Sequence, residues 1–168
     1  MMRVFVAADI TDNVLINNII SAQSVIGGRN VKQENLHFTL QFLGEVDESS
    51  IPDIINKLQT IKFDGFDVTL HGIGTFGRPA RLIWVGVTDH TPLQELSDSI
   101  GHTLEQKSNK KFTPHLTISR LKKNDKINIT PYKDYTWGVQ HMDRFKIKRS
   151  VLAPTGPVYT DMAEVTCN

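Results

Sequence analysis

The chain has 168 residues and a formal net charge of +1, with 39% hydrophobic and 22% charged residues. These values are ordinary for a globular protein with a substantial core, and they exclude a disordered or collagen-like chain. No apolar run approaches the ~20 residues that a membrane-spanning helix needs, and the single cysteine, Cys167, excludes an internal disulfide. We therefore expect a cytoplasmic protein that does not enter a membrane.

The first third of the chain predicts a strand, a helix, a strand and a helix. Residues 4–8 are all apolar, which indicates a strand buried on both faces. A helix over residues 13–25 follows, and Gly27-Gly28 ends it. We expect Gly44 to break the next strand, and we expect a second helix to begin near Pro52.

The remainder predicts a similar alternation. Strands are expected at residues 66–76 and 82–87, and a third helix runs from residue 91 to about residue 107. Residues 122–131 are polar and predict a loop. Residues 142–152 alternate basic and apolar side chains at strand period, with Val151 on the apolar face, and a last strand covers residues 158–165. The repeated order suggests an internal duplication.

Positive charge is concentrated in one segment of the chain. Residues 107–149 carry 12 Lys and Arg against 3 Asp and Glu, whereas residues 1–106 carry 7 against 13. Such a segment favours a phosphate-rich partner, although a run of charge is more often a solvated surface.

Two tetrapeptides share one pattern of histidine, apolar residue, threonine and apolar residue. They are His37-Phe38-Thr39-Leu40 and His115-Leu116-Thr117-Ile118. In a strand, alternate side chains point to the same face, so each histidine lies beside its threonine while the apolar residues face a core. A single copy often reflects only the solvent-exposed face of a strand. Two copies with the same polar face favour a functional interpretation.

The residue types suit an anionic ligand. Two imidazoles can supply one general acid and one general base near neutral pH, and two hydroxyls can donate hydrogen bonds to oxygens held between them. Neither tetrapeptide contains an acidic residue. The pattern therefore predicts a site for a group such as a phosphodiester.

These motifs resemble those of the two-histidine phosphoesterase superfamily. Within it, the chain is similar to the RNA 2′,3′-cyclic phosphodiesterases, historically called 2′-5′ RNA ligases. The resemblance covers nearly the full length and includes Arg3-Val4-Phe5-Val6-Ala7, the trailing Phe42-Leu43-Gly44, Pro114 to Arg120 around the second motif, and Ser150 to Tyr159 near the end.

The resemblance implies hydrolysis of the 2′,3′-cyclic phosphate at an RNA or nucleotide end to a 2′-phosphate. We assign His37 as the acid that protonates the departing 3′ oxygen and His115 as the base that acts on water, although the two roles can be exchanged. Thr39 and Thr117 would hold the non-bridging oxygens. Arg120 would reach the phosphate only if its strand ends or bends near Ser119.

Two aromatic residues are candidates for stacking on a base or ribose, with packing as the alternative interpretation: Phe76, before a turn, and Tyr159, after one. No histidine or cysteine has a partner at metal-ligand spacing, so we expect neither a metal nor another cofactor. The expected partners are RNA or nucleotide 2′,3′-cyclic phosphate ends, with no obligate protein partner.

The expected fold class is α+β. Two pseudo-symmetric lobes of mainly antiparallel sheet would carry helices on the outside and share a central cleft, as the family does, with residues 1–168 forming a single bilobal phosphodiesterase domain. Two alternatives remain open at this point. The same residues could catalyse the reverse joining of RNA ends, or the fold could be a non-catalytic module that binds nucleotides or RNA.

Overall fold

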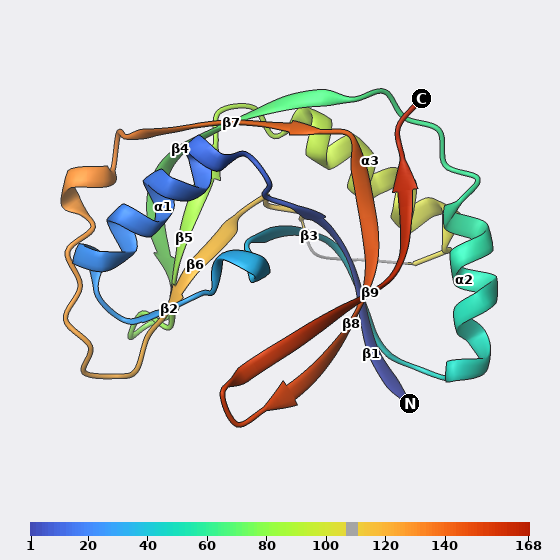
Figure 1. The fold of residues 1–168 in the computed structure, drawn as a ribbon, viewed down its shortest axis with the longest axis horizontal. Helices are drawn as coiled ribbons and strands as arrows, with labels where there is room; N and C mark the ends of the chain where they lie inside the picture. Colours follow the sequence, from blue (N-terminus) through green and yellow to red (C-terminus); the bar gives the residue numbers. More distant parts are fainter. Residues whose placement is uncertain (107–110) are drawn as a thin grey trace.

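Over residues 1–106 and 111–168, which the computed structural model describes, the chain forms strands, α-helices and short 3₁₀ turns (Figure 1). The strands are β1 (Met2–Asp9), β2 (Arg29–Asn30), β3 (His37–Val46), β4 (Phe66–Phe76), β5 (Leu82–Val87), β6 (Leu116–Arg120), β7 (Thr136–Met142), β8 (Arg144–Ala153) and β9 (Gly156–Thr166). The α-helices are α1 (Asn13–Ile26), α2 (Ile51–Leu58) and α3 (Thr91–Thr103).

All the strands belong to one antiparallel sheet with the order β7-β4-β5-β6-β3-β1-β8-β9, and β2 pairs with β6. The two central strands, β3 and β6, are joined through one residue pair, Phe38 with Leu116. This narrow junction divides the sheet into two lobes. We call β3, β1, β8 and β9 the first lobe, and β6, β5, β4, β7 and β2 the second lobe. The expected α+β architecture of two antiparallel lobes is confirmed.

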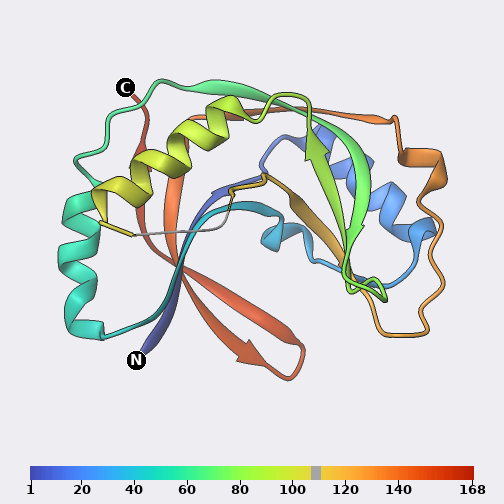
Figure 2. The same cartoon turned by 180° about the vertical axis from the view of Figure 1, so that it is seen from behind.

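Each lobe is completed by a helix that connects two long strands of the other lobe. Helix α1 connects β1 to β3 by way of β2, yet it packs against β6 and β7. Helix α3 connects β5 to β6, yet it packs against β3 and α2. Figure 1 shows α1 at the front of the second lobe, and Figure 2, the view from behind, brings α3 to the front of the first. The order of strand, helix and motif strand therefore occurs twice, but the further helix predicted after each motif strand is present only after β3, as α2, in the described part of the chain. The lobes also interleave along the chain.

The hydrophobic core forms between the helices and the sheet. The apolar residues of the two motifs, Phe38, Leu40, Leu116 and Ile118, are almost completely buried in one cluster with the apolar stripes of α1 and α3. Burial of each such side chain stabilises the fold by roughly 1.5–3 kcal/mol. Because side chains alternate along a strand, this core directs His37 and His115 to the opposite face.

Local signals explain the helix ends. Oδ1 of Asp12 accepts a hydrogen bond from the backbone N–H of Leu15 at 2.9 Å, which caps the start of α1. Helix α3 ends earlier than predicted. The N–H of Gln106 donates to the carbonyl of Gly101 at 2.8 Å, and Glu105 adopts a positive φ of 55°. This is the Schellman arrangement that terminates a helix, and the predicted end near Lys107 lies outside the described residues.

One strand prediction was wrong. Gly44 does not break its strand, because it adopts a φ of 73° at a bulge and β3 continues to Val46. The strand predicted over residues 142–152 is confirmed to within two residues as β8, whereas β7, which ends at Met142, was missed. The predicted loop at residues 122–131 is confirmed up to a 3₁₀ turn that begins at Thr130.

Among the described residues, no helix has both the length and the apolar character needed to cross a lipid bilayer.

Candidate active site

The two histidine motifs meet where the lobes join. Phe38 pairs with Leu116, so antiparallel register brings His37 beside Thr117 and Thr39 beside His115. The two histidines are then diagonal neighbours, for which regular spacing is about 7–8 Å. All four side chains line one cleft of about 1110 Å³ on the face opposite the core. The structure therefore brings the predicted residues together around a single space.

Both imidazoles make the same hydrogen bond. Nδ1 of His37 lies 2.6 Å from the carbonyl oxygen of Asn35, and Nδ1 of His115 lies 2.9 Å from that of Thr113. A carbonyl oxygen can only accept, so each Nδ1 carries the proton and donates it. In the neutral form Nε2 is then the acceptor on each ring. Nε2 of His37 lies 3.1 Å from Oγ1 of Thr39.

Aromatic rings enclose His37. Its ring centroid lies 5.3 Å from that of Phe5 and 5.4 Å from that of Tyr159, the latter edge to face. This burial lowers the pKa of His37 below its ordinary value of 6.5, while the carbonyl of Asn35 and the carboxylate of Asp9 act in the opposite direction. The free site therefore favours the neutral imidazole of His37.

The aromatic candidates lie at different places. Tyr159 lines the cleft and contacts both His37 and Phe5. Phe76 packs edge to face on His115, with 5.0 Å between ring centroids, and also against Trp84 at 5.6 Å. Phe76 thus supports the second histidine in the same manner as Tyr159 supports the first, rather than forming part of the cleft lining.

A bulge brings Arg120 into the cleft. On β6, Thr117 pairs with Trp84 and Ser119 pairs with Ile83, so Ile118 is an extra residue in this strand. Ile118 and Ser119 are consequently both buried, and Arg120 returns to the face of Thr117 and lines the cleft. The bend that the sequence required for Arg120 is present.

The first motif strand has the same bulge in the same place. On β3, Leu40 is the extra residue between Thr39 and Gln41. Gln41 then turns toward α3, where its Nε2 donates to the carbonyl of Ser97 at 3.0 Å. Phe42 returns to the cleft with 76% of its surface exposed. Phe42 therefore occupies the position in the first lobe that Arg120 occupies in the second, and sequence reasoning missed it.

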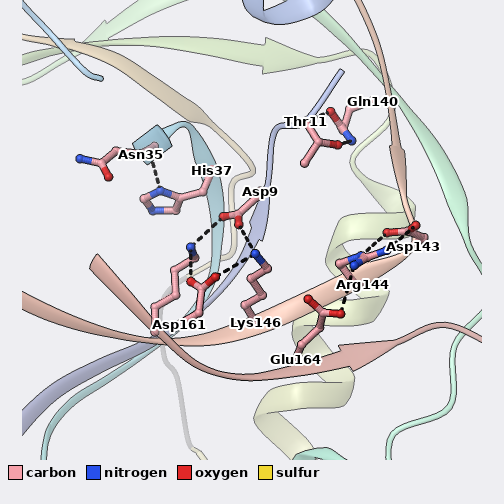
Figure 3. A network of polar contacts seen from close by, with 11 residues as sticks. Asp9, Thr11, Asn35, His37, Gln140, Asp143, Arg144, Lys146, Asp161 and Glu164 are labelled. Carbon is pink, nitrogen blue, oxygen red and sulfur yellow. Dashed lines mark hydrogen bonds and ion pairs between the residues drawn. The ribbon is translucent and has the colours of Figure 1, made fainter. Parts of the chain in front are cut away.

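A ring of four charges lies beside His37. Nζ of Lys148 lies 3.1 Å from Oδ1 of Asp9 and 2.8 Å from Oδ1 of Asp161, and Nζ of Lys146 lies 3.1 Å and 2.9 Å from the other oxygens of the same carboxylates. Figure 3 shows Asp9, a member of this ring, beside His37. Lys148 is almost completely buried, and its charge contributes to the low pKa of His37. Its place in an alternating basic strand gave no sign of this burial.

In the part of the chain that the structure describes, no three or more His, Cys, Asp and Glu side chains are grouped to hold a metal ion.

Two interleaved lobes that present paired His-x-Thr motifs to one cleft define the class of the two-histidine phosphoesterases. Comparison with known proteins agrees with this class. Residues 17–138 match the family model of the 2′-5′ RNA ligase superfamily. A protein of Archaeoglobus fulgidus named RNA 2′,3′-cyclic phosphodiesterase is 34% identical over 96% of this chain and 98% of its own length. A protein of the same name from Methanocaldococcus jannaschii is 35% identical, over 97% of this chain and 99% of its own.

Solved structures show the same relationship. E. coli LigT in complex with 3′-AMP superimposes with a TM-score of 0.84 at 25% identity, covering 99% of this chain and 98% of LigT. The LigT complex with phosphate gives a TM-score of 0.83 at 26% identity, with the same coverage. The chain belongs to the 2′-5′ RNA ligase superfamily.

Proposed function

We propose that this protein hydrolyses 2′,3′-cyclic phosphates at RNA ends to 2′-phosphates, with its two histidines as general acid and general base. The observation that supports this most is the shared geometry of His37 and His115. Each donates Nδ1–H to a backbone carbonyl and so keeps Nε2 available at one cleft. The relatives named RNA 2′,3′-cyclic phosphodiesterase, which align over nearly their whole length, support the substrate class.

The reaction needs two proton transfers on opposite sides of phosphorus. Water attacks phosphorus and gives a proton to one imidazole, while the bond from phosphorus to the 3′ oxygen breaks and the other imidazole protonates that oxygen. The products are a 2′-phosphate and a free 3′-hydroxyl. Histidines placed diagonally across the junction of β3 and β6 suit this in-line geometry.

We assign His37 as the acid and His115 as the base. Burial lowers the pKa of His37, so an acid at this position requires the bound anion to favour the imidazolium and raise that pKa again. If His37 is instead the base, it must be neutral in the free enzyme, and burial already favours this neutral form. The pH profiles of the single variants distinguish the two: if His37 is the acid, the residual kcat/KM of His37→Ala keeps only the rise with pH that the base causes, and if His37 is the base, it keeps only the fall with pH that the acid causes.

The other cleft residues would hold the substrate. The hydroxyls of Thr39 and Thr117 and the guanidinium of Arg120 donate to the non-bridging oxygens and stabilise the charge that develops on them. Phe42 and Tyr159 offer aromatic surfaces for the base or ribose. Phe76 acts through His115, which it contacts.

Phosphorus NMR of a 2′,3′-cyclic nucleotide incubated with the protein and EDTA tests the proposal, because it reports turnover and regiochemistry together. We expect a single 2′-phosphate product. His37→Ala and His115→Ala should each reduce kcat by roughly 10²–10⁴-fold, with melting curves that show folded protein. Wild-type turnover in either variant would falsify the mechanism.

Two other functions can be separated by the same assays. Joining of a 2′,3′-cyclic end to a 5′-hydroxyl is the reverse reaction at the same residues, and quantifying both products from one labelled RNA measures their ratio. A non-catalytic module would bind AMP or RNA ends without hydrolysis over hours. The two Nε2 acceptors at one cleft favour catalysis, because a module that only binds needs no pair of proton-transfer groups.

A further inference from the structure

The cleft extends beyond the four motif residues. Arg29, Leu152, Pro157 and Tyr159 line it as well as the two histidines. Its volume of about 1110 Å³ exceeds the ~300–1,000 Å³ of sites for small molecules. A mononucleotide that reacts between the histidines therefore leaves part of the cleft unfilled.

One wall of this extension is apolar. The pairing of β8 with β1 reaches only Ser150, whereas the pairing of β8 with β9 continues to Ala153 and Gly156, so the hairpin projects beyond the sheet (Figure 1). Tyr159 and Pro157 are two residues apart, and Leu152 pairs with Pro157, so the three share one face. Tyr159 contacts His37, which identifies this face as the one toward the cleft. Leu152 is 85% exposed there.

The same projection explains Val151. The sequence placed Val151 on the strand face of Phe145 and Ile147, and the pairing of β8 with β9 keeps this alternation. Unlike those two residues, Val151 is 45% exposed, because β1 has ended before it and only β9 pairs with β8 at this point.

The facing wall is cationic. Arg29 of β2 pairs directly with Arg120 of β6, so the two side chains lie next to each other on one face. Like charges directly opposite one another in a strand pair are destabilising. No carboxylate of the described residues forms an ion pair with either guanidinium. Two adjacent arginines without a counter-ion are a site for anions.

The two walls face each other at close range. Nη2 of Arg29 donates to the backbone carbonyl of Thr155, at the tip of the hairpin, at 2.6 Å. Nδ2 of Asn35 lies 3.5 Å from the carbonyl oxygen of Pro157. A guanidinium has five N–H donors, so the bond to Thr155 leaves most of the donors of Arg29 available to a ligand.

From this arrangement we infer that the cleft holds a second nucleotide of an RNA strand. The cyclic phosphate lies at Thr117 and Arg120, the phosphodiester on its 5′ side lies at Arg29, and the nucleoside that follows packs on Pro157 and Leu152. A single RNA strand carries phosphates along one side and apolar base faces along the other. The phosphates would contact the cationic wall, and the bases would pack on the apolar wall. The preferred substrate is thus an RNA end of two or more nucleotides, an inference that depends on the proposed function.

Steady-state kinetics on adenosine 2′,3′-cyclic phosphate and on di- and trinucleotides with the same cyclic end test this inference. For the wild type we expect kcat/KM to be at least about tenfold higher for the dinucleotide, as is usual when one charge-assisted contact and one stacked group are gained. Arg29→Ala should lower this ratio and make the salt dependence for the dinucleotide shallower by about 0.7 in log–log slope, the value for one phosphate contact on a single strand. Leu152→Ala should lower the ratio without changing the slope.

Arg144→Ala is the matched control, because it removes an arginine from the far end of β8, where Asp143 and Glu164 already pair with it. It should leave both the ratio and the slope at their wild-type values. Equal kcat/KM for all chain lengths in the wild type would overturn the inference and leave the proposed function intact. An equal loss on mononucleotide and dinucleotide in Arg29→Ala would overturn it too, since Arg29 would then only hold the hairpin. Failure to hydrolyse any of the three substrates would count against the proposed function itself.

Discussion

The buried ammonium of Lys148 lies 3.1 Å from the carboxylate of Asp9, the residue that pairs with His37 across β1 and β3. This contact couples the charge ring to the electrostatics of the active site. Lys148 lowers the pKa of His37, and Asp9 raises it. We therefore expect a substitution in the ring to change the pKa of His37, and with it the rate, although the substituted residue does not contact the substrate.

Lys148→Met tests this coupling. Removal of the cation leaves the charge of Asp9 less compensated, so the pKa of His37 should rise, as followed by its imidazole NMR signals in a pH titration. Breaking a buried ion pair at one partner costs about 3–5 kcal/mol, and we expect a somewhat smaller loss here because Asp161 is partly exposed. Urea denaturation measures that loss. Lys146→Met, in the same ring but more exposed, is the control and should move the pKa of His37 less.

The low pKa of His37 also predicts how stability depends on pH. Unfolded, this histidine titrates near its ordinary value of 6.5, whereas folded it titrates lower. Above 6.5 both states are neutral and His37 has no effect; as the pH falls below 6.5 the unfolded state takes up the proton first, so the free energy of unfolding decreases. The slope from this residue is at most about 1.4 kcal/mol per pH unit.

Urea denaturation at pH 7.5 and pH 5.5 checks this sign. The wild type should lose more stability between these values than His37→Gln does. An equal loss in both proteins would mean that the pKa of His37 is not lowered in the folded state.

Phe42→Ala should weaken substrate binding more than turnover. Phe42 is highly exposed at the cleft, so its removal has little effect on the core, and stacking of a base on an aromatic side chain contributes roughly 1–3 kcal/mol. We expect KM for the cyclic nucleotide to increase by about 5–150-fold, with an unchanged melting temperature. Val139→Ala, which trims an exposed apolar side chain of β7 away from the cleft, should not change KM.

Gly74→Ala should disturb the site from behind His115. A Cβ at this position would clash with the indole of Trp84. Trp84 packs against Phe76, and Phe76 packs against His115. Overpacking of this kind costs about 1–3 kcal/mol, and displacement of Phe76 should also reduce kcat. Gly44→Ala is the comparison: its Cβ would meet nothing within 4 Å, and only the φ of 73° opposes it. Its stability should fall while kcat stays the same.

Much of the fold can be predicted from local sequence patterns, but which side chains line the cleft cannot. The bounds of β4 and β5 were predicted correctly because Gly77 and its neighbours interrupt an otherwise regular alternation. The pairing of His37 with Thr39, and of His115 with Thr117, follows from the same alternation. Bulges shift that alternation without a sequence signal, which is why the position of Phe42 was missed and that of Arg120 depended on a bend. Burial of Lys148 depends on Asp9 and Asp161, which come from distant strands.

The exchange of helices between the lobes has a consequence for how such a chain arose. A single ancestral unit of strand, helix and motif strand would leave its own sheet uncovered, because its helix covers the sheet of the other unit. Two copies could be stable only as an intertwined homodimer, in which each subunit lends its helix to the other. That dimer would carry identical side chains where Phe42 and Arg120 now differ, and so could not distinguish one end of a nucleotide from the other. In a single polypeptide the two positions can differ, as Phe42 and Arg120 do.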